Sequence, residues 1–280
     1  MTFLAAGKVN YRVRIERSEL LGSRHPFARE ILLFYAVLAA FQSDLFEHLS
    51  KEWGRQPVVP PGGTIRSVLN LPILIKPFGT FLALVESRAP NPLAAEARLV
   101  KGQGDTAWAA VLEGFWKTGL QESPSENETG EPLKEFLARA FLQPYAEFVV
   151  SAMLPPVLPM TVSCCPRCSS LPLLGVLRQE GDGGKRLLQC SFCSQEWEFR
   201  RIFCAYCGED KEQKLPVYVA DQFPYIRVEA CETCKHFLRT VDLTKDGNAI
   251  PIVDDLAAVP LSLWAHENGY TRIQSNLLGT

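Results

Sequence analysis

The strongest constraint on this chain is a run of four Cys-x-x-Cys pairs between residues 165 and 234. Two thiolates three residues apart in a tight turn point the same way and form half of a tetrahedral metal site. Four such halves make two complete four-cysteine sites. The predicted metal ligands are Cys165, Cys168, Cys190, Cys193, Cys204, Cys207, Cys231 and Cys234.

The intervals between the pairs indicate which halves belong together. Twenty-one residues separate Cys168 from Cys190, ten separate Cys193 from Cys204, and twenty-three separate Cys207 from the last pair. Two knuckles joined by about twenty residues are typical of zinc ribbons and rubredoxin-like sites. Sequential pairing is therefore the simplest prediction, and an interleaved cross-brace stays open as the alternative.

An internal repeat supports the sequential pairing. An apolar run follows the first and the third pair, at residues 173–177 and 215–219, and each run leads into a turn with Gly or Pro. Arg186 and Arg227 then stand four residues before the third cysteine of their copies. A strand, a turn and a second strand between two knuckles form one structural unit, which occurs twice in the chain. Because its core is small, we expect metal binding to supply much of its folding free energy.

Two other uses of cysteine compete with metal binding. Disulfides would need an oxidising compartment, but residues 1–10 lack the long apolar stretch of a secretory signal, so we expect a reducing, cytoplasmic location. A thioredoxin-type redox motif would open a helix after a strand and would need one pair, not four. The ninth cysteine, Cys164, is interpreted as a spare thiol beside the first pair.

Composition and charge exclude several classes of function. The chain has 47% hydrophobic residues and a net charge of −2, which is typical of a soluble protein of about two domains. No apolar run reaches the roughly 18–20 residues of a membrane span, so membrane insertion is not expected. Residues 160–280 carry thirteen basic and fifteen acidic side chains, and eight thiolates on two divalent ions would add four negative charges. Nucleic acid is therefore a disfavoured partner.

The first half of the chain has the apolar spacing of helices. Residues 27–49 follow a three-to-four-residue period after Pro26, which predicts a helix ending near Gly54. Further helices are predicted over 65–88 (interrupted at Pro72 and Pro77), 92–101, 106–118 and 132–152. The Pro-rich segment 154–159 is predicted to be a stiff connector. The predicted domains are a helical domain at 1–159, a first ribbon module at 160–200, and a second ribbon module with a closing helix at 201–280.

The fold class predicted here is α+β: an all-helical N-terminal domain, two tandem four-cysteine modules, and a C-terminal helix that stops at Gly269. The sequence shows no catalytic constellation, phosphate loop or nucleophile elbow, so we expect a protein that is not an enzyme. Asp254 and Asp255 are interpreted as helix-start residues. The histidines are scattered: His25, His48, His236 and His266.

The residues around the four pairs resemble one known family, that of the formate dehydrogenase accessory protein FdhE. Similar features include the segments at Asp254 to Ala257 and Gly269-Tyr270 and, more weakly, the helix that begins at His25-Pro26-Phe27. The matching motifs are Cys165-Pro166-x-Cys168, Arg186-x-Leu188-x-Cys190-x-x-Cys193-x-x-Glu196-Trp197, Arg201-x-x-Cys204-x-x-Cys207 and Arg227-x-Glu229-x-Cys231-x-x-Cys234-x-x-x-Leu238. The chain departs from the family in a short N-terminus and in Ser169, where many members have glycine.

The resemblance implies a cytoplasmic protein without catalytic activity that assists biogenesis of respiratory formate dehydrogenase by contacting its catalytic subunit. It also implies iron bound in rubredoxin-like fashion, although four thiolates suit zinc equally well. A rubredoxin-like electron-transfer or redox-sensing protein acting on the same enzyme is the alternative. Arg200 and Arg201 are candidate partner contacts, and Trp197 is expected to close the small core beside the second knuckle.

Overall fold

The computed structural model describes residues 10–52, 58–60, 62–119, 131–154, 158–181 and 183–279. By contacts between Cα atoms the chain divides into two compact units, one made of Met1–Ala36 with Leu154–Thr280 and the other of Val37–Met153. This grouping places the first 36 residues with the ribbon region. The division into 1–159, 160–200 and 201–280 stays a prediction, and much of the predicted connector at 154–159 lies outside the described residues.

The unit Val37–Met153 is helical, as the apolar spacing predicts. Its aromatic core includes Phe78, Phe81 and Phe141, all fully buried, with ring centroids 4.9–6.3 Å apart. The elements are the C-terminal part of α2 (Arg29–Glu52), the short 3₁₀ helix η2 (Ile65–Ser67), α3 (Leu71–Arg88), α4 (Leu93–Gly102), α5 (Asp105–Thr118) and α6 (Glu131–Ser151).

The proline positions in α3 correct one detail of the prediction. Pro72 stands in the first turn of α3, where a missing amide proton costs nothing. Pro77 lies inside the helix, which nevertheless continues to Arg88. The predicted interruption at Pro77 is therefore wrong. The predicted end of the preceding helix near Gly54 lies outside the described residues.

A helix that the sequence prediction missed, α1 (Tyr11–Arg24), precedes the 3₁₀ turn η1 (Pro26–Ala28). The side chain of Asn10 caps it by accepting a hydrogen bond of 3.4 Å from the amide of Val13. Its buried face includes two arginines, Arg14 and Arg17, so no apolar stripe marks it in the sequence.

Among the residues that the structure describes, one helix, Pro26–Glu52, is long and apolar enough to cross a membrane by length and composition, with a mean hydropathy of 1.2 in its best window. Of that window, 39% is buried inside the protein. A core helix of a soluble protein meets the same criterion. The absence of membrane insertion stays a prediction.

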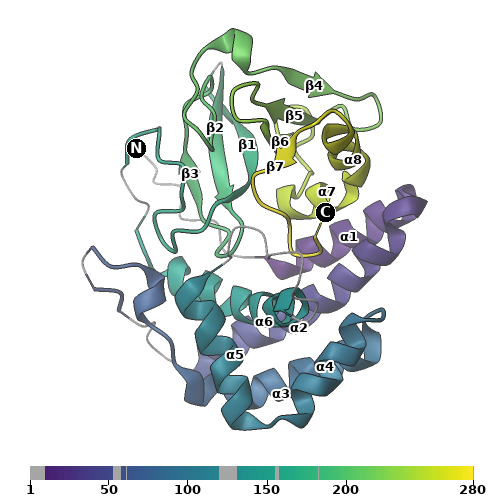
Figure 1. The fold of residues 1–280 in the computed structure, drawn as a ribbon, viewed down its shortest axis with the longest axis vertical. Helices are drawn as coiled ribbons and strands as arrows, with labels where there is room; N and C mark the ends of the chain where they lie inside the picture. Colours follow the sequence, from purple (N-terminus) through teal and green to yellow (C-terminus); the bar gives the residue numbers. More distant parts are fainter. Residues whose placement is uncertain are drawn as a thin grey trace. The chain divides into compact units, whose positions relative to one another are not determined.

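The other unit is built on a seven-stranded sheet (Figure 1). Its strands run in the order β3-β2-β1-β6-β5-β4, and β7 pairs with β6. The strands are β1 (Pro172–Glu180), β2 (Gly183–Cys190), β3 (Glu196–Glu198), β4 (Val217–Val219), β5 (Ile226–Ala230), β6 (His236–Asp242) and β7 (Thr271–Arg272), and the 3₁₀ turn η3 (Glu212–Lys214) precedes β4.

The two ribbon repeats share this one sheet. The first contributes β1 to β3 and the second contributes β4 to β6, and the joint is a parallel pairing of β1 with β6. The two equivalent three-stranded units lie head to tail in the sheet, so the first strand of the first unit, β1, lies beside the third strand of the second unit, β6. At the joint Gly175 faces Thr240, and a Cβ atom at Gly175 would lie 2.3 Å from the Thr240 Oγ1.

Two short helices close the chain, where one was expected. They are α7 (Pro251–Ala257) and α8 (Val259–Glu267), separated by Ala258 and with Pro260 in the first turn of α8. Gly269 follows α8 with φ of 80°, the left-handed conformation of a helix stop. The helix α7 packs against β1, β6 and α1, and α8 packs against β7 (Figure 1).

Candidate metal centres

The structure brings the eight paired cysteines together in two groups. The sulfur atoms of each group lie within 4.8 Å of one another, and the grouping is sequential rather than interleaved. The first cluster is Cys165, Cys168, Cys190 and Cys193, and the second cluster is Cys204, Cys207, Cys231 and Cys234.

All four Cys-x-x-Cys turns share one backbone geometry. In each, the amide of the first cysteine donates to the carbonyl five residues later, at 2.8–2.9 Å. The residue after the second cysteine has a left-handed backbone in every turn: Ser169 (φ 63°), Ser194 (φ 55°), Gly208 (φ 79°) and Lys235 (φ 58°). Such residues are uncommon outside glycine and mark positions that the surrounding structure fixes. Four independent segments thus adopt the same knuckle.

Backbone amides point at the sulfur of the first cysteine in several knuckles. Cys190 Sγ accepts from the amides of Phe192 and Cys193 at 3.3 and 3.4 Å. Cys204 Sγ accepts from those of Tyr206 and Cys207 at 3.4 and 3.5 Å. Hydrogen bonds of this kind stabilise a thiolate relative to a thiol.

The distances between sulfurs test whether an ion fits. In the first cluster, Cys168 Sγ lies 3.3 Å from Cys190 Sγ and 3.7 Å from Cys193 Sγ. In the second, the pairs Cys204–Cys234 and Cys207–Cys231 both lie at 3.7 Å. A tetrahedral ion with bonds to sulfur of about 2.3 Å puts its ligands about 3.8 Å apart. Both clusters therefore have the donor atoms and nearly the spacing for one tetrahedral ion each.

The surroundings of the first cluster shift the pKa values of its thiols in opposite directions. Hydrogen bonds with neighbouring thiols, that of Cys165 first, lower the pKa of Cys168 well below its ordinary value. Burial raises the pKa of Cys190 and Cys193 well above it. A bound cation would favour four thiolates at this place. Its positive charge would offset the cost of burying negatively charged sulfur atoms.

In the second cluster, which is more exposed to solvent, burial and hydrogen bonds again shift the thiol pKa values in opposite directions. Burial raises the pKa of Cys204 to about 11 and also raises that of Cys234. Burial acts on Cys231 as well, but hydrogen bonds from the amides of Cys234 and Thr233 lower its pKa overall. A bound cation would favour four thiolates here as well, because its positive charge would offset the cost of burying them.

The predicted supporting residues have defined contacts. Trp197 is buried after the second knuckle and donates from Nε1 to the Val162 carbonyl at 2.8 Å, as a residue closing a small core would. Arg200 is half exposed and lies 3.6 Å from Asp210. Arg201 donates to the Gly184 carbonyl.

Four other candidates stand outside the groups of metal-ligating side chains found among the described residues. Cys164 is exposed beside the first cluster. The ring of His236 stacks on Tyr206 at 3.7 Å, and its Nδ1 lies 2.9 Å from the Cys234 carbonyl oxygen. Asp254 and Asp255 are fully buried in α7, where arginines surround them.

A link between the knuckles of the second cluster was missed in the sequence. The backbone carbonyl of Glu209 accepts from Cys204, and its carboxylate accepts from the Thr233 hydroxyl at 2.6 Å. The backbone amide of Glu232 donates to the Lys214 carbonyl at 2.8 Å. Local spacing could not have identified the contacts of Thr233 with Glu209 and of Glu232 with Lys214, because they join residues 24 and 18 positions apart.

Models of known protein families match the two ribbon regions of the chain. Residues 188–278 match the model of the FdhE C-terminal domain, and residues 164–201 match that of the FdhE central domain. The Protein FdhE homolog of Aquifex aeolicus is 34% identical over 116 residues, which cover 41% of each chain. That of Pseudomonas aeruginosa is 38% identical over 119 residues, 41% of this chain and 38% of the relative.

A longer match includes part of the helical region. The Protein FdhE homolog of Haemophilus influenzae strain PittEE is 32% identical over 196 residues, 69% of this chain and 55% of the relative. The matched part thus spans about two fifths to one half of the length of these relatives.

The fold comparison covers nearly all of the chain. The crystal structure of the FdhE protein from Pseudomonas aeruginosa superposes with a TM-score of 0.67 and 25% identity, over 96% of this chain and 95% of that one. With both ribbon domains matched and the fold shared over almost its whole length, the chain is similar to the FdhE family in sequence and in fold.

Proposed function

We propose that this chain is a cytoplasmic accessory protein for the maturation of formate dehydrogenase and acts by binding rather than by catalysis. The observation that carries the proposal is the fold shared with the Pseudomonas aeruginosa FdhE protein, together with two cysteine clusters in the matched ribbon domains. The formate dehydrogenase role comes from the family that the chain resembles.

The eight clustered cysteines are the ligands of two metal ions in this proposal. The support is geometric, because both groups of sulfurs have tetrahedral spacing and three-residue knuckles. Each ion, iron or zinc, would supply a cross-link between two knuckles that the small ribbon cores do not provide. Elemental analysis of protein purified without oxygen tests this directly: two ions per chain are expected, and a folded protein without metal would contradict it.

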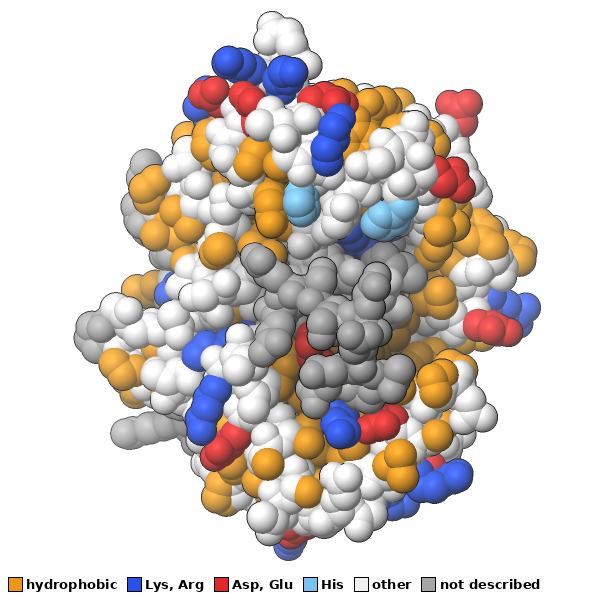
Figure 2. Space-filling model, in the orientation of Figure 1, with side chains coloured by type: hydrophobic (Ala, Val, Ile, Leu, Met, Phe, Trp, Pro, Cys, Tyr) orange, Lys and Arg blue, Asp and Glu red, His pale blue; other side chains and the backbone are white. Residues whose placement is uncertain are grey.

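The partner in this proposal is the catalytic subunit of formate dehydrogenase. The unit that carries the clusters offers exposed apolar side chains suited to a protein partner, among them Ile202, Tyr206, Val217 and Val219. On the face drawn in Figure 2, basic and acidic side chains are interspersed. Such mixed charge offers no phosphate-binding face in that view.

Co-purification with a tagged catalytic subunit tests the partner. We expect Ile202→Glu and Val219→Glu to weaken retention, because a charge would be buried in the contact. Leu263→Glu is the matched control, since Leu263 is also exposed but lies on α8. Formate dehydrogenase activity is then measured in a deletion strain complemented by each variant. We expect it to fall for the variants that lose retention and to stay unchanged for the control. Full retention and activity by both ribbon variants would contradict this surface, and no retention of the unaltered chain would contradict the partner.

Electron transfer or redox sensing is the second candidate function. One observation favours it: Cys207 of the second cluster is exposed. An iron there would lie near the surface, where electrons can exchange with a partner. A reversible redox couple of the iron-loaded protein would support this function. Zinc as the ion present in the cell would rule it out.

A further inference from the structure

The sheet has two edge strands, β3 and β4, and they differ in their surroundings. Strand β3 carries two glutamates, which pair with Arg178 and Lys185. Between these glutamates, Trp197 donates to the carbonyl of Val162, so a neighbouring segment lies beside this edge. Charged side chains and a covering segment are two means by which proteins keep an edge strand from pairing with another chain.

Strand β4 has neither protection among the residues that the structure describes. It has no charged side chain, and Val217 and Val219 are 52% and 67% exposed. Figure 1 shows β4 on the outer side of the sheet, next to β5. One face of β4 is covered, because the ring of Tyr218 packs on that of Trp264 at 4.6 Å. The face with the valines and the outer edge are open.

The backbone of β4 presents hydrogen-bonding groups along this outer edge. In the ladder with β5, the amide of Ala230 donates to the Pro216 carbonyl at 3.0 Å. Hydrogen-bonded positions alternate in an antiparallel ladder, so Tyr218 is the next residue of this segment that bonds to β5. The amides and carbonyls of Val217 and Val219 therefore face away from the sheet. Two donors and two acceptors in a line match the backbone of an extended peptide.

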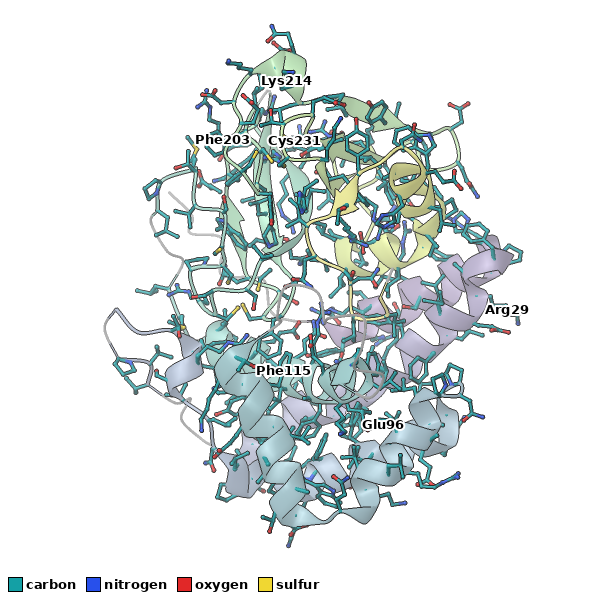
Figure 3. The ribbon with its side chains drawn as sticks, viewed as in Figure 1. Arg29, Glu96, Phe115, Phe203, Lys214 and Cys231 are labelled. Atoms are coloured by element: carbon teal, nitrogen blue, oxygen red, sulfur yellow. The ribbon has the colours of Figure 1, made fainter. Side chains whose placement is uncertain are left out.

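A cavity of about 150 Å³ lies on the face of the sheet that carries the two valines. Val217 is exposed and also lines this cavity, which places the cavity next to the free edge. Figure 3 labels two other residues of its wall, Phe203 and Cys231. A volume of this size holds one side chain as large as leucine or phenylalanine. The apolar side of the wall also includes Leu215, Leu238 and Ile273.

The arginines around the cavity already have partners, which favours an uncharged side chain inside it. Arg186 and Arg227 both donate to Glu229. Arg201 donates to the carbonyl of Gly184. A charged side chain that entered the cavity would lose its water without gaining a counter-charge from these groups.

We propose that an extended apolar segment of the partner protein adds to the sheet as an antiparallel strand beside β4, with one apolar side chain in the cavity. The residues of this segment that bond to Val217 and Val219 place their side chains on the same face as the valines, where the cavity lies. Backbone bonds supply affinity, and the cavity selects the side chain. The inference rests on the proposed function, because the segment belongs to the catalytic subunit of formate dehydrogenase.

The length of the edge favours a flexible segment over a second copy of this chain. Strand β4 has three residues. Two folded proteins need roughly 800 Å² of surface from each partner for a stable interface, far more than a strand of this length offers. A flexible segment can pair with the strand and also reach the cavity beside it.

Backbone methylation of a bound peptide tests strand addition. The probes are overlapping peptides of about 15 residues that cover the catalytic subunit, and their binding to the full chain is measured by fluorescence anisotropy. We expect at least one peptide to bind. Methyl groups on alternate amide nitrogens should weaken its binding at least about tenfold when those amides face β4, and less than about threefold when the intervening amides carry them. Equal effects of the two patterns would overturn strand addition.

An alanine scan of the same peptide tests the cavity. We expect one apolar residue to be essential, with a loss of at least about tenfold on replacement by alanine. In an antiparallel strand this residue belongs to the alternating set whose amides do not tolerate methylation. An essential residue in the other set, or none at all, would overturn the placement of a side chain in the cavity.

A matched pair of substitutions tests the edge from the side of the protein. Val219→Pro removes one outward donor and keeps the bonds of Tyr218 to β5, as edge strands allow. It should weaken peptide binding at least about fivefold, whereas Val219→Ala keeps the amide and should cost less than about twofold. Hydrogen exchange at the amide of Val228 checks that the ladder survives. Equal binding by the two variants would overturn the edge as the site.

Co-purification with the whole catalytic subunit separates this inference from the proposed function. If the unaltered chain retains the subunit but binds none of its peptides, and Val219→Pro retains it as well as Val219→Ala does, strand addition is rejected and the proposed function stands. If the unaltered chain does not retain the subunit, the proposed function itself is rejected. Self-association that is lost in Val219→Pro, measured by analytical ultracentrifugation, would assign the edge to a second copy and overturn the inference.

Discussion

Arg186 of the first ribbon donates to the carboxylate of Glu229 in the second ribbon, at 2.5 Å. Arg227, which holds the same place in the second repeat as Arg186 in the first, donates to the other oxygen of Glu229 at 2.7 Å. The guanidinium of Arg186 is buried, and its second nitrogen donates to the Arg200 carbonyl at 2.7 Å. Two equivalent arginines thus converge on one acid, and this acid connects the repeats beyond their shared strands.

Replacing Glu229 by Gln should destabilise the ribbon unit by about 3–5 kcal/mol, because it leaves the buried charge of Arg186 without its counter-charge. The measurement is amide hydrogen exchange in β5 of the metal-loaded protein, which reports the free energy of opening. Arg227→Gln should cost less, since Arg227 is more exposed than Arg186.

The control for this prediction is an exposed ion pair. Lys117 and Glu113 lie 3.1 Å apart on α5 with both side chains largely in solvent. Glu113→Gln should therefore change the stability little. An effect of Glu229→Gln as small as that of the control would mean that Arg186 is not desolvated.

The acid dependence of stability should show the same interaction. Burial raises the pKa of Glu229, but the charges of Arg186 and Arg227 outweigh it and lower the pKa below its ordinary 4.5. A carboxyl whose folded pKa is depressed stabilises the fold above the unfolded value, and the stability is lost as pH falls through the folded value. The advantage of wild type over Glu229→Gln should thus be full at pH 6 and shrink below about pH 4.5. An advantage that does not change between pH 6 and pH 3.5 would contradict this prediction.

The knuckles and strands could be predicted from the sequence because their signals are local. Spacing of three between cysteines, and apolar runs that end in turns, depend on neighbouring residues alone. The parallel joint of β1 with β6 could not be predicted in this way, since Gly175 and Thr240 are far apart in sequence. The acceptor shared by Arg186 and Arg227 depends on this joint, so the spacing of residues could not identify Glu229 as that acceptor.

Gly175→Ala should destabilise the ribbon unit by roughly 1–3 kcal/mol, because the added Cβ would meet Thr240 Oγ1 at 2.3 Å and force β1 away from β6. Thr240→Ala in the same chain should restore part of the loss by removing that oxygen. The test is the midpoint of thermal unfolding for both single variants and the double variant. Additive losses in the double variant would show that the two residues do not collide.

Helix α1 could not be predicted because arginines occupy its buried face. Arg17 donates to the carboxylate of Asp254 at 2.5–3.2 Å, and Tyr225 donates to the same carboxylate at 2.8 Å. Asp254 was expected to be a helix-start residue, and it does accept from the amide of Ile250 at 2.7 Å. The bond between Asp254 and Arg17 of α1 joins residues far apart in the sequence, so the periodicity of apolar residues could not predict it.

Asp254→Asn should increase the rate of hydrogen exchange in α1 more than in the sheet. The substitution removes one of the two carboxylates that pair with the buried guanidinium of Arg17, while Asp246 stays at 3.1 Å, and should cost about 1–3 kcal/mol. Hydrogen exchange is expected to accelerate in α1 and α7 and to change less in β2. Glu16→Gln, which breaks an exposed pair with Arg12 on the same helix, is the control and should leave exchange as it was. Unchanged protection of α1 in Asp254→Asn would mean that other contacts hold the helix.

Removing both metal ions should unfold the ribbons and spare the helical unit. The strands β2 and β5 each end at or beside a knuckle cysteine, so the proposed ions would supply part of the free energy that folds them. The unit Val37–Met153 has its own core around Phe78, Phe81 and Phe141, and none of the eight clustered cysteines belongs to it. After chelation, we expect hydrogen exchange in β2 and β5 to rise to the rates of an open chain, while α6 keeps its protection. Restoring the ions should restore the protection of both strands. Protection of β2 that survives complete chelation would show that the first ribbon folds without its ion, and equal loss in α6 would show that the two units fold as one.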